Sequence, residues 1–140
     1  MYPMIRSALV LLGGVVAAVI VVTLMDALVG RLYSLPAGTD PNDPESLQRA
    51  VAALPVAAFA FLVAGWTLAA GVGSYVAARF AAYARPFHGM IVALFVLVAT
   101  VTNLVKIPHP VWLWPATIIF IPTAGWLATK LVARPRLGKS

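Results

Sequence analysis

The 140-residue sequence contains no cysteine and very few charged residues. Without cysteine, the chain can form no disulfide bond, no thiolate metal site and no cysteine nucleophile. Charged residues make up 10% of the chain, whereas soluble proteins contain about 25%. Apolar residues make up 62%, and the mean hydropathy is +0.96. A soluble domain of this size could not cover so much apolar surface, so we expect lipid to surround most of these side chains.

Acidic residues are especially scarce. The chain has four acidic and ten basic residues, which gives a net charge of +6. Nucleic-acid-binding proteins also have a basic excess, which they gather into a patch or stripe. In this sequence the basic residues stand instead at the ends of apolar segments, where membrane topology accounts for them. We therefore expect no nucleic-acid partner.

Four apolar segments are each long enough to cross a hydrocarbon core of about 30 Å at about 1.5 Å per residue. The first could be mistaken for a signal peptide, but its apolar run is too long and no small-residue cleavage site follows it. The sequence therefore predicts an all-α protein with a single domain, residues 1–140, built as a four-helix transmembrane bundle. The predicted spans are residues 7–30, 55–80, 89–107 and 111–133.

The distribution of basic residues predicts the orientation of these spans. Cytoplasmic loops are enriched in lysine and arginine, and the larger basic group is found when both termini are placed in the cytoplasm. The connection 31–54 then lies outside. The cytoplasmic group comprises Arg6, Arg79, Arg85, Lys130, Arg134, Arg136 and Lys139, and the external group comprises Arg31, Arg49 and Lys106.

Three of the four acids, Asp40, Asp43 and Glu45, lie in the external connection. Asp43 followed by Pro44 and Glu45 is typical of a helix start, with an aspartate cap, proline at the first position and an acid in the first turn. We expect a short interfacial helix with one apolar face here. A calcium site is the alternative, but the alternating ligands and the glycine of known calcium loops are missing.

The fourth acid, Asp26, lies inside the first span. Asn103 and Lys106 reach a similar depth in the third span, and we treat the three as a candidate intramembrane polar cluster. A charge within lipid costs a few kcal/mol and therefore has either a partner or a function. Asp26 is expected to act either as a structural clamp, paired with Lys106 or Asn103, or as an ion or proton site.

Two prolines, Pro115 and Pro122, lie seven residues apart in the fourth span and are candidate kinks. Each removes a backbone hydrogen bond, and the result is either an adjustment of shape or a hinge. Small residues also recur four apart, which is typical of close helix packing in membranes and does not prove an oligomer. These sets are Gly13/Ala17, Gly14/Ala18, Ala69/Gly73/Ala77 and Ala124/Ala128.

The external connection contains the pattern Pro-x-Gly-x-Asp-x-x-Asp-x-Glu-Ser-Leu, residues 36–47. This pattern resembles a family of uncharacterised bacterial membrane proteins with four spans. The resemblance implies a four-helix fold in the bacterial cytoplasmic (inner) membrane and implies no activity. That family often has asparagine at the position of Asp26. Further similarity lies in Gly71-Val72-Gly73, Ala77-Ala78, Asn103, Pro110-x-Trp112, Ile121-Pro122 and Trp126-Leu127.

No set of residues predicts catalysis, since an enzyme needs a nucleophile with a base, paired carboxylates or a metal cluster. We therefore expect neither an enzyme nor a cofactor. By elimination the chain is expected to be a structural or accessory subunit that contacts lipid and binds another membrane protein or a second copy of itself. The alternative is a small oligomeric transporter or channel that uses Asp26 with Asn103 and Lys106; Thr67, Ser74 and Tyr75 are further candidates for its path.

Overall fold

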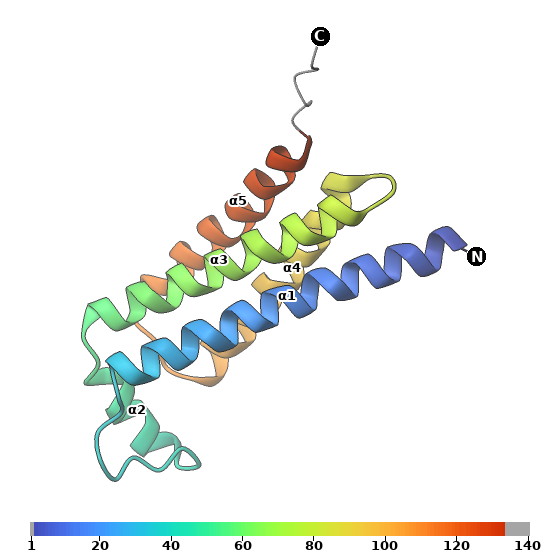
Figure 1. The fold of residues 1–140 in the computed structure, drawn as a ribbon. Coiled ribbons are helices and arrows are strands. Elements are labelled where there is room, and N and C mark those ends of the chain that lie inside the picture. Colours follow the sequence, from blue (N-terminus) through green and yellow to red (C-terminus); the bar gives the residue numbers. More distant parts are fainter. Residues whose placement is uncertain (1, 134–140) are drawn as a thin grey trace.

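The computed structural model describes residues 2–133, and these form five helices with short connections (Figure 1). Four of the helices are long and apolar enough to cross a membrane, and a short helix lies between the first two. The prediction of an all-α bundle with four membrane spans is therefore confirmed. The helices are α1 (Tyr2–Leu32), α2 (Pro44–Ala52), α3 (Val56–Phe80), α4 (Arg85–Lys106) and α5 (Leu113–Ala133).

Helix boundaries differ from the predicted spans where proline determines the start. Helix α4 begins at Arg85, four residues before the predicted span, with Pro86 in its first turn. Proline is favourable there because its fixed φ suits a helix and its missing N–H is not needed. Helix α5 begins two residues later than predicted. The residues before it form a turn, in which the N–H of Leu113 donates to the carbonyl of Pro110 at 3.1 Å.

Helices α3 and α4 form the centre of the bundle, because each packs against all three other spans. Helices α1 and α5 lie on opposite sides of this pair and do not contact each other (Figure 1). Helix α3 is buried at intervals along its length, whereas α1 buries only Gly14, Ala18 and Val29. Most of α1 therefore presents apolar side chains outward, as a lipid-facing helix does.

The tightest contact of the bundle is the crossing of α1 and α3 at Gly14 and Gly73. A Cβ atom placed on Gly14 would lie 2.8 Å from the carbonyl oxygen of Gly73, and one on Gly73 would lie 2.7 Å from that of Gly14. Val92 of α4 packs against the same point, at 2.9 Å from either position. The backbones touch, so only glycine fits. The small-residue pattern thus serves packing within one chain, as predicted.

A second close contact joins α3, α4 and α5. The hydroxyl of Ser74, which is fully buried, donates to the carbonyl of Gly89 at 2.8 Å. A Cβ atom on Gly125 of α5 would lie 3.1 Å from the same hydroxyl oxygen and would collide with Ala93. Three backbones therefore meet around one serine, and the half of the bundle away from α2 is closed.

The first turns of α1 are tied to the same closed half. Ser7 shares a hydrogen bond of 3.0 Å with the hydroxyl of Tyr83, in the turn between α3 and α4. Arg6 donates to the carbonyl of Phe80 at 3.4 Å. Nearer α2, α1 remains against α3, since a Cβ atom on Gly65 would lie 2.8 Å from that of Met25. Because α1 contacts α3 along its length, any space beside α1 within the bundle must lie between α1 and α4.

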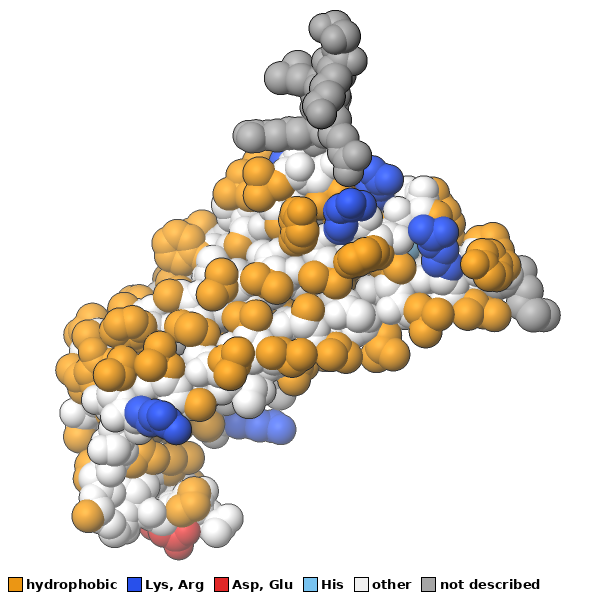
Figure 2. Space-filling view, viewed as in Figure 1, with side chains coloured by type: hydrophobic (Ala, Val, Ile, Leu, Met, Phe, Trp, Pro, Cys, Tyr) orange, Lys and Arg blue, Asp and Glu red, His pale blue; other side chains and the backbone are white. Residues whose placement is uncertain are grey.

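Charged residues lie at both ends of the bundle (Figure 2). Basic side chains without acidic ones lie at the end where α1 begins and α3 ends, whereas the opposite end, by α2, has both basic and acidic side chains. This division agrees with a cytoplasmic basic end. The orientation itself stays a prediction, and the expected basic residues Arg134, Arg136 and Lys139 lie outside the described residues.

The orientation can be tested with single cysteines, since the chain has none of its own. A cysteine at Thr39, near α2, should react in intact cells with a maleimide that does not cross membranes. A cysteine at Ala82, an exposed position in the turn between α3 and α4, should react only after the cells are lysed. The reverse pattern would show that the basic end faces outward.

The crossing of α1 and α3 predicts opposite effects for two adjacent glycines. Gly14→Ala should lower the free energy of unfolding by about 1–3 kcal/mol, because the added methyl overpacks against backbone. Gly13→Ala should be neutral or stabilising by up to about 1 kcal/mol, because nothing lies within 4 Å of its added Cβ. The measurement is unfolding in detergent followed by circular dichroism. Equal effects of the two substitutions would contradict the assigned crossing.

Candidate functional site

The acids of the connection between α1 and α3 are engaged in local structure. Asp43 caps α2, as predicted: its Oδ1 accepts from the N–H of Glu45 at 3.3 Å and its Oδ2 from the N–H of Ser46 at 3.2 Å. Pro44 is the first residue of the helix, and Glu45 lies in the first turn, where a negative charge is favourable. The cap satisfies two of the N–H groups that a helix start leaves without partners.

Asp40 has a structural role that the sequence analysis did not assign. Its Oδ1 accepts from the N–H of Asn42 at 2.9 Å, which closes an Asx turn. Its own N–H donates to the hydroxyl of Ser46 at 3.0 Å, so the turn is fastened to α2. Within residues 2–133, no group of three histidine, cysteine or acidic residues is placed to hold a metal ion.

Helix α2 packs onto the end of the bundle through its apolar face. Val51 is buried in the main hydrophobic cluster, and Leu47 and Leu54 pack against that cluster from its edge. The predicted amphipathic helix is therefore present. It covers one end of α3, near the turn that joins α4 to α5.

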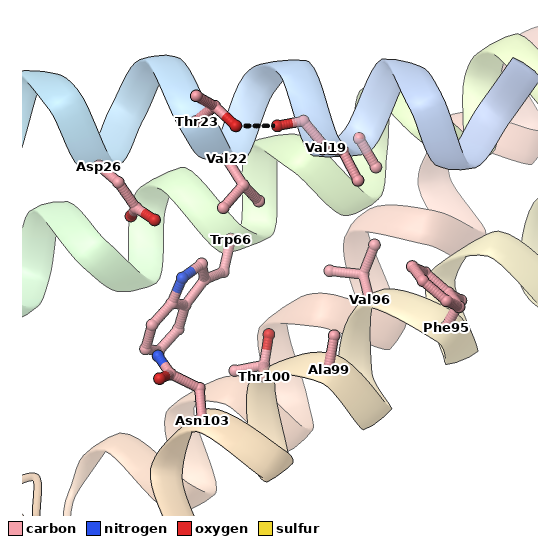
Figure 3. A pocket seen from close by; sticks show the side chains of 11 residues that line it. Val19, Val22, Thr23, Asp26, Trp66, Phe95, Val96, Ala99, Thr100 and Asn103 are labelled. Atoms are coloured by element: carbon pink, nitrogen blue, oxygen red, sulfur yellow. Dashed lines mark hydrogen bonds between the residues drawn. The ribbon is translucent and has the colours of Figure 1, made fainter. Parts of the chain in front are cut away.

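The candidate site is a cavity of about 290 Å³ between α1 and α4, with α3 behind it (Figure 3). The structure brings Asp26 of α1 and Asn103 of α4 to this one cavity, which agrees with their predicted similar depth. Trp66 of α3 lies between them in the view of Figure 3. The lining residues are Ala18, Val19, Val22, Thr23, Asp26, Trp66, Phe95, Val96, Ala99, Thr100 and Asn103.

The cavity wall changes from apolar to polar along its length. On α1 the lining runs from Ala18 through Val22 to Asp26, and on α4 it runs from Phe95 to Asn103. Both helices pass through the bundle in the same direction, from the closed half towards α2 (Figure 1). The apolar end therefore lies near the middle of the membrane, and the polar end lies towards the interface.

Two nearly buried polar side chains, Trp66 and Thr100, point into the cavity. Each is 4% exposed, and Figure 3 draws no hydrogen bond from either to the other pocket residues. Every other threonine in residues 2–133 donates to a backbone carbonyl. The Thr100 hydroxyl is not joined to Val96, four residues earlier (Figure 3). No buried side-chain nitrogen or oxygen in residues 2–133 lacks a hydrogen-bond partner, so the polar atoms of Trp66 and Thr100 are accessible from the cavity and available to a group that enters it.

The proposed clamp around Asp26 does not form by direct contact in this structure. No hydrogen bond is drawn between Asp26 and Asn103, whose side chains lie on opposite sides of the cavity (Figure 3). Lys106 is exposed and does not line the cavity. Of the three members of the predicted polar cluster, Asp26 and Asn103 therefore belong to the candidate site.

The other predicted path residues lie elsewhere. Ser74 is buried and bonded to Gly89, Thr67 donates to the carbonyl of Val63 at 2.7 Å, and Tyr75 is 43% exposed. The sequence analysis missed Trp66 and Thr100. The spacing of Val96, Thr100 and Asn103, four and then three residues apart, could have indicated one face of α4.

The two prolines of α5 differ in their positions. Pro115 is the third residue of α5, where its missing N–H costs nothing because no partner exists in the first turn. A kink at Pro115 stays a prediction. Pro122 does lie in the helix interior and must interrupt the hydrogen-bond ladder. Next to it, Thr123 donates to the carbonyl of Ile119 at 2.6 Å. Neither proline lines the candidate site.

No protein-family model, curated protein or solved structure matches this chain. The resemblance to the bacterial four-span family therefore has no support beyond the shared architecture. The chain is a multi-pass integral membrane protein. That conclusion depends on the four apolar helices, and the candidate site must be interpreted from its own residues.

The cap of α2 predicts a local effect of substitution at Asp43. Asp43→Ala should speed hydrogen exchange of the α2 amides about fivefold, because the lost cap is worth about 1 kcal/mol and a helix of nine residues is marginal alone. Asp43→Asn is the control and should leave exchange nearly unchanged, because asparagine caps equally well. Equal acceleration by both substitutions would indicate that charge, and not the cap, holds α2.

Proposed function

We propose that this protein is a non-enzymatic accessory protein of the cytoplasmic membrane that binds a lipid-like molecule in the cavity between α1 and α4. The observation on which the proposal depends is the lining of this cavity, in which mostly apolar side chains are joined by Asp26, Asn103, Trp66 and Thr100. Ligand sites are typically apolar pockets with a few convergent polar groups, and this cavity has that composition.

The position of the cavity favours a ligand that arrives from the bilayer. Its walls belong to α1 and α4, and α1 faces lipid along most of its length. Ala99, at the α4 wall, is exposed, so the cavity opens sideways between the two helices. A molecule dissolved in the membrane reaches such an opening without first crossing water.

The rival proposal, a transporter or channel, is supported by the presence of Asp26 and Asn103 in one cavity. A path through a single chain would have to continue across the other half of the bundle. That half is closed by backbone contact at Gly14 and Gly73 and by the buried bond of Ser74. Transport would therefore need a large rearrangement or a path between copies, and binding needs neither.

Occlusion of the cavity tests the proposal. Ala99→Phe should place a ring in the cavity mouth, and the protein purified from membranes should then retain less bound lipid in native mass spectrometry. Val98→Phe is the matched control, since Val98 is 58% exposed on the same helix and lines no part of the cavity. We expect lipid retention at the wild-type level in Val98→Phe and at least about tenfold lower occupancy in Ala99→Phe.

Equal lipid retention in the two variants would contradict binding in the cavity. A measurement of proton or cation flux through the reconstituted protein provides a second way to overturn the proposal. If the reconstituted protein conducts protons or cations, and Asp26→Asn abolishes that flux, the transporter is the correct alternative. No flux in either protein agrees with a binding role.

A further inference from the structure

We propose that the cavity between α1 and α4 selects amphiphiles with a positively charged ammonium head, and that Asp26 is the counter-ion. This inference rests on the proposed function, because it names the class of molecule that the cavity holds. The inference follows from the single acid in the cavity wall, from the order of polar and apolar groups along that wall, and from the hydrogen-bonding groups that line it.

The wall of the cavity contains one acid, Asp26, and no basic residue among those that the structure describes. Asp26 is the only acid within the four membrane spans, because Asp40, Asp43 and Glu45 belong to the external connection. No lysine or arginine within residues 2–133 lines the cavity, and the nearest basic residue on α4, Lys106, is exposed outside it. A carboxylate in lipid needs a partner, and a cationic ligand supplies one without any change in the protein.

The depth of Asp26 suits an amphiphile held at the interface. It lies six residues before the end of α1, which corresponds to about 9 Å along the helix axis. The wall beyond it, towards the middle of the membrane, is formed by Val22, Val19 and Ala18 of α1 and by Val96 and Phe95 of α4. A head group at Asp26 would therefore have its hydrocarbon tail in the apolar part of the same cavity.

The polar groups that line the cavity match an ammonium group better than a hydroxyl or a phosphate. An ammonium group has three N–H donors and no acceptor. The cavity offers acceptors in the Asp26 carboxylate, the Asn103 carbonyl and the Thr100 hydroxyl. Trp66, an aromatic side chain of the kind that attracts cations, lines the same cavity. A phosphate would be repelled by Asp26, and the lining has no lysine or arginine to bind it.

Quenching of Trp66 fluorescence tests this inference in the full-length protein. Trp112, Trp114 and Trp126 are replaced by phenylalanine, so that Trp66 becomes the sole indole, and the protein is placed in phosphatidylcholine nanodiscs. Bromine quenches tryptophan only near contact, and Trp66 is buried except towards the cavity. The probes are a dibromododecylamine and the dibromododecanol with the same tail.

We expect the amine to quench Trp66 at a lower concentration than the alcohol. Asp26→Asn should raise the half-quenching concentration of the amine at least about tenfold, because the loss of one partner from a desolvated charge pair costs more than an order of magnitude in affinity. Asp26→Asn should change the half-quenching concentration of the alcohol only slightly. Asp40→Asn is the matched control, since it removes the same charge from the external connection and should change neither titration.

The possible outcomes separate this inference from the proposed function. If amine and alcohol quench equally and Asp26→Asn has no effect, selection for ammonium is wrong, although binding in the cavity stands. If Ala99→Phe leaves both titrations unchanged, neither probe enters the cavity, and the proposed function fails as well. A dibrominated phosphatidylethanolamine in a third titration shows whether a membrane lipid or a free amine supplies the ammonium group.

Discussion

The bundle depends on one contact between backbones, where α1 and α3 cross at Gly14 and Gly73. Lipid gives helices no hydrophobic reason to associate, so the association of a mostly exposed α1 requires close approach. Two glycines provide it, with Val92 of α4 packed against the crossing. Because the three helices meet at this point, α1 and α4 are held together in one half of the bundle and leave space between them in the other half.

The candidate site is a consequence of this geometry. Where α1 and α4 separate, side chains from both helices line a cavity with Trp66 of α3 behind it. Asp26 and Asn103 reach the same cavity although 77 positions separate them in the chain (103 − 26 = 77). The connection between α1 and α3, whose acids are more conspicuous in the sequence, is engaged in turns and a helix cap. Local hydrogen bonds explain those acids, and they do not explain Asp26.

The sequence predicted features that depend on local chemistry or on composition. Four apolar segments imply four helices, because a backbone in lipid must satisfy its hydrogen bonds internally. The cap at Asp43 and the start at Pro44 follow from the needs of a helix N-terminus. Pro115 lies in the first turn of α5, because the helix begins only two residues earlier. Helix boundaries depend on turn geometry, which apolar patterns describe poorly.

The sequence by itself determined the class of protein, the number of spans and the short helix of the external connection, since composition and neighbouring residues decide these. Only the tertiary structure decided which glycines form the crossing, because Gly13 and Gly14 are equivalent in sequence, and only Gly14 faces α3. It also decided that Asp26 and Asn103 border a cavity without touching, and that Thr100 and Trp66 join them. These relations depend on the rotation and separation of packed helices, which no local pattern specifies.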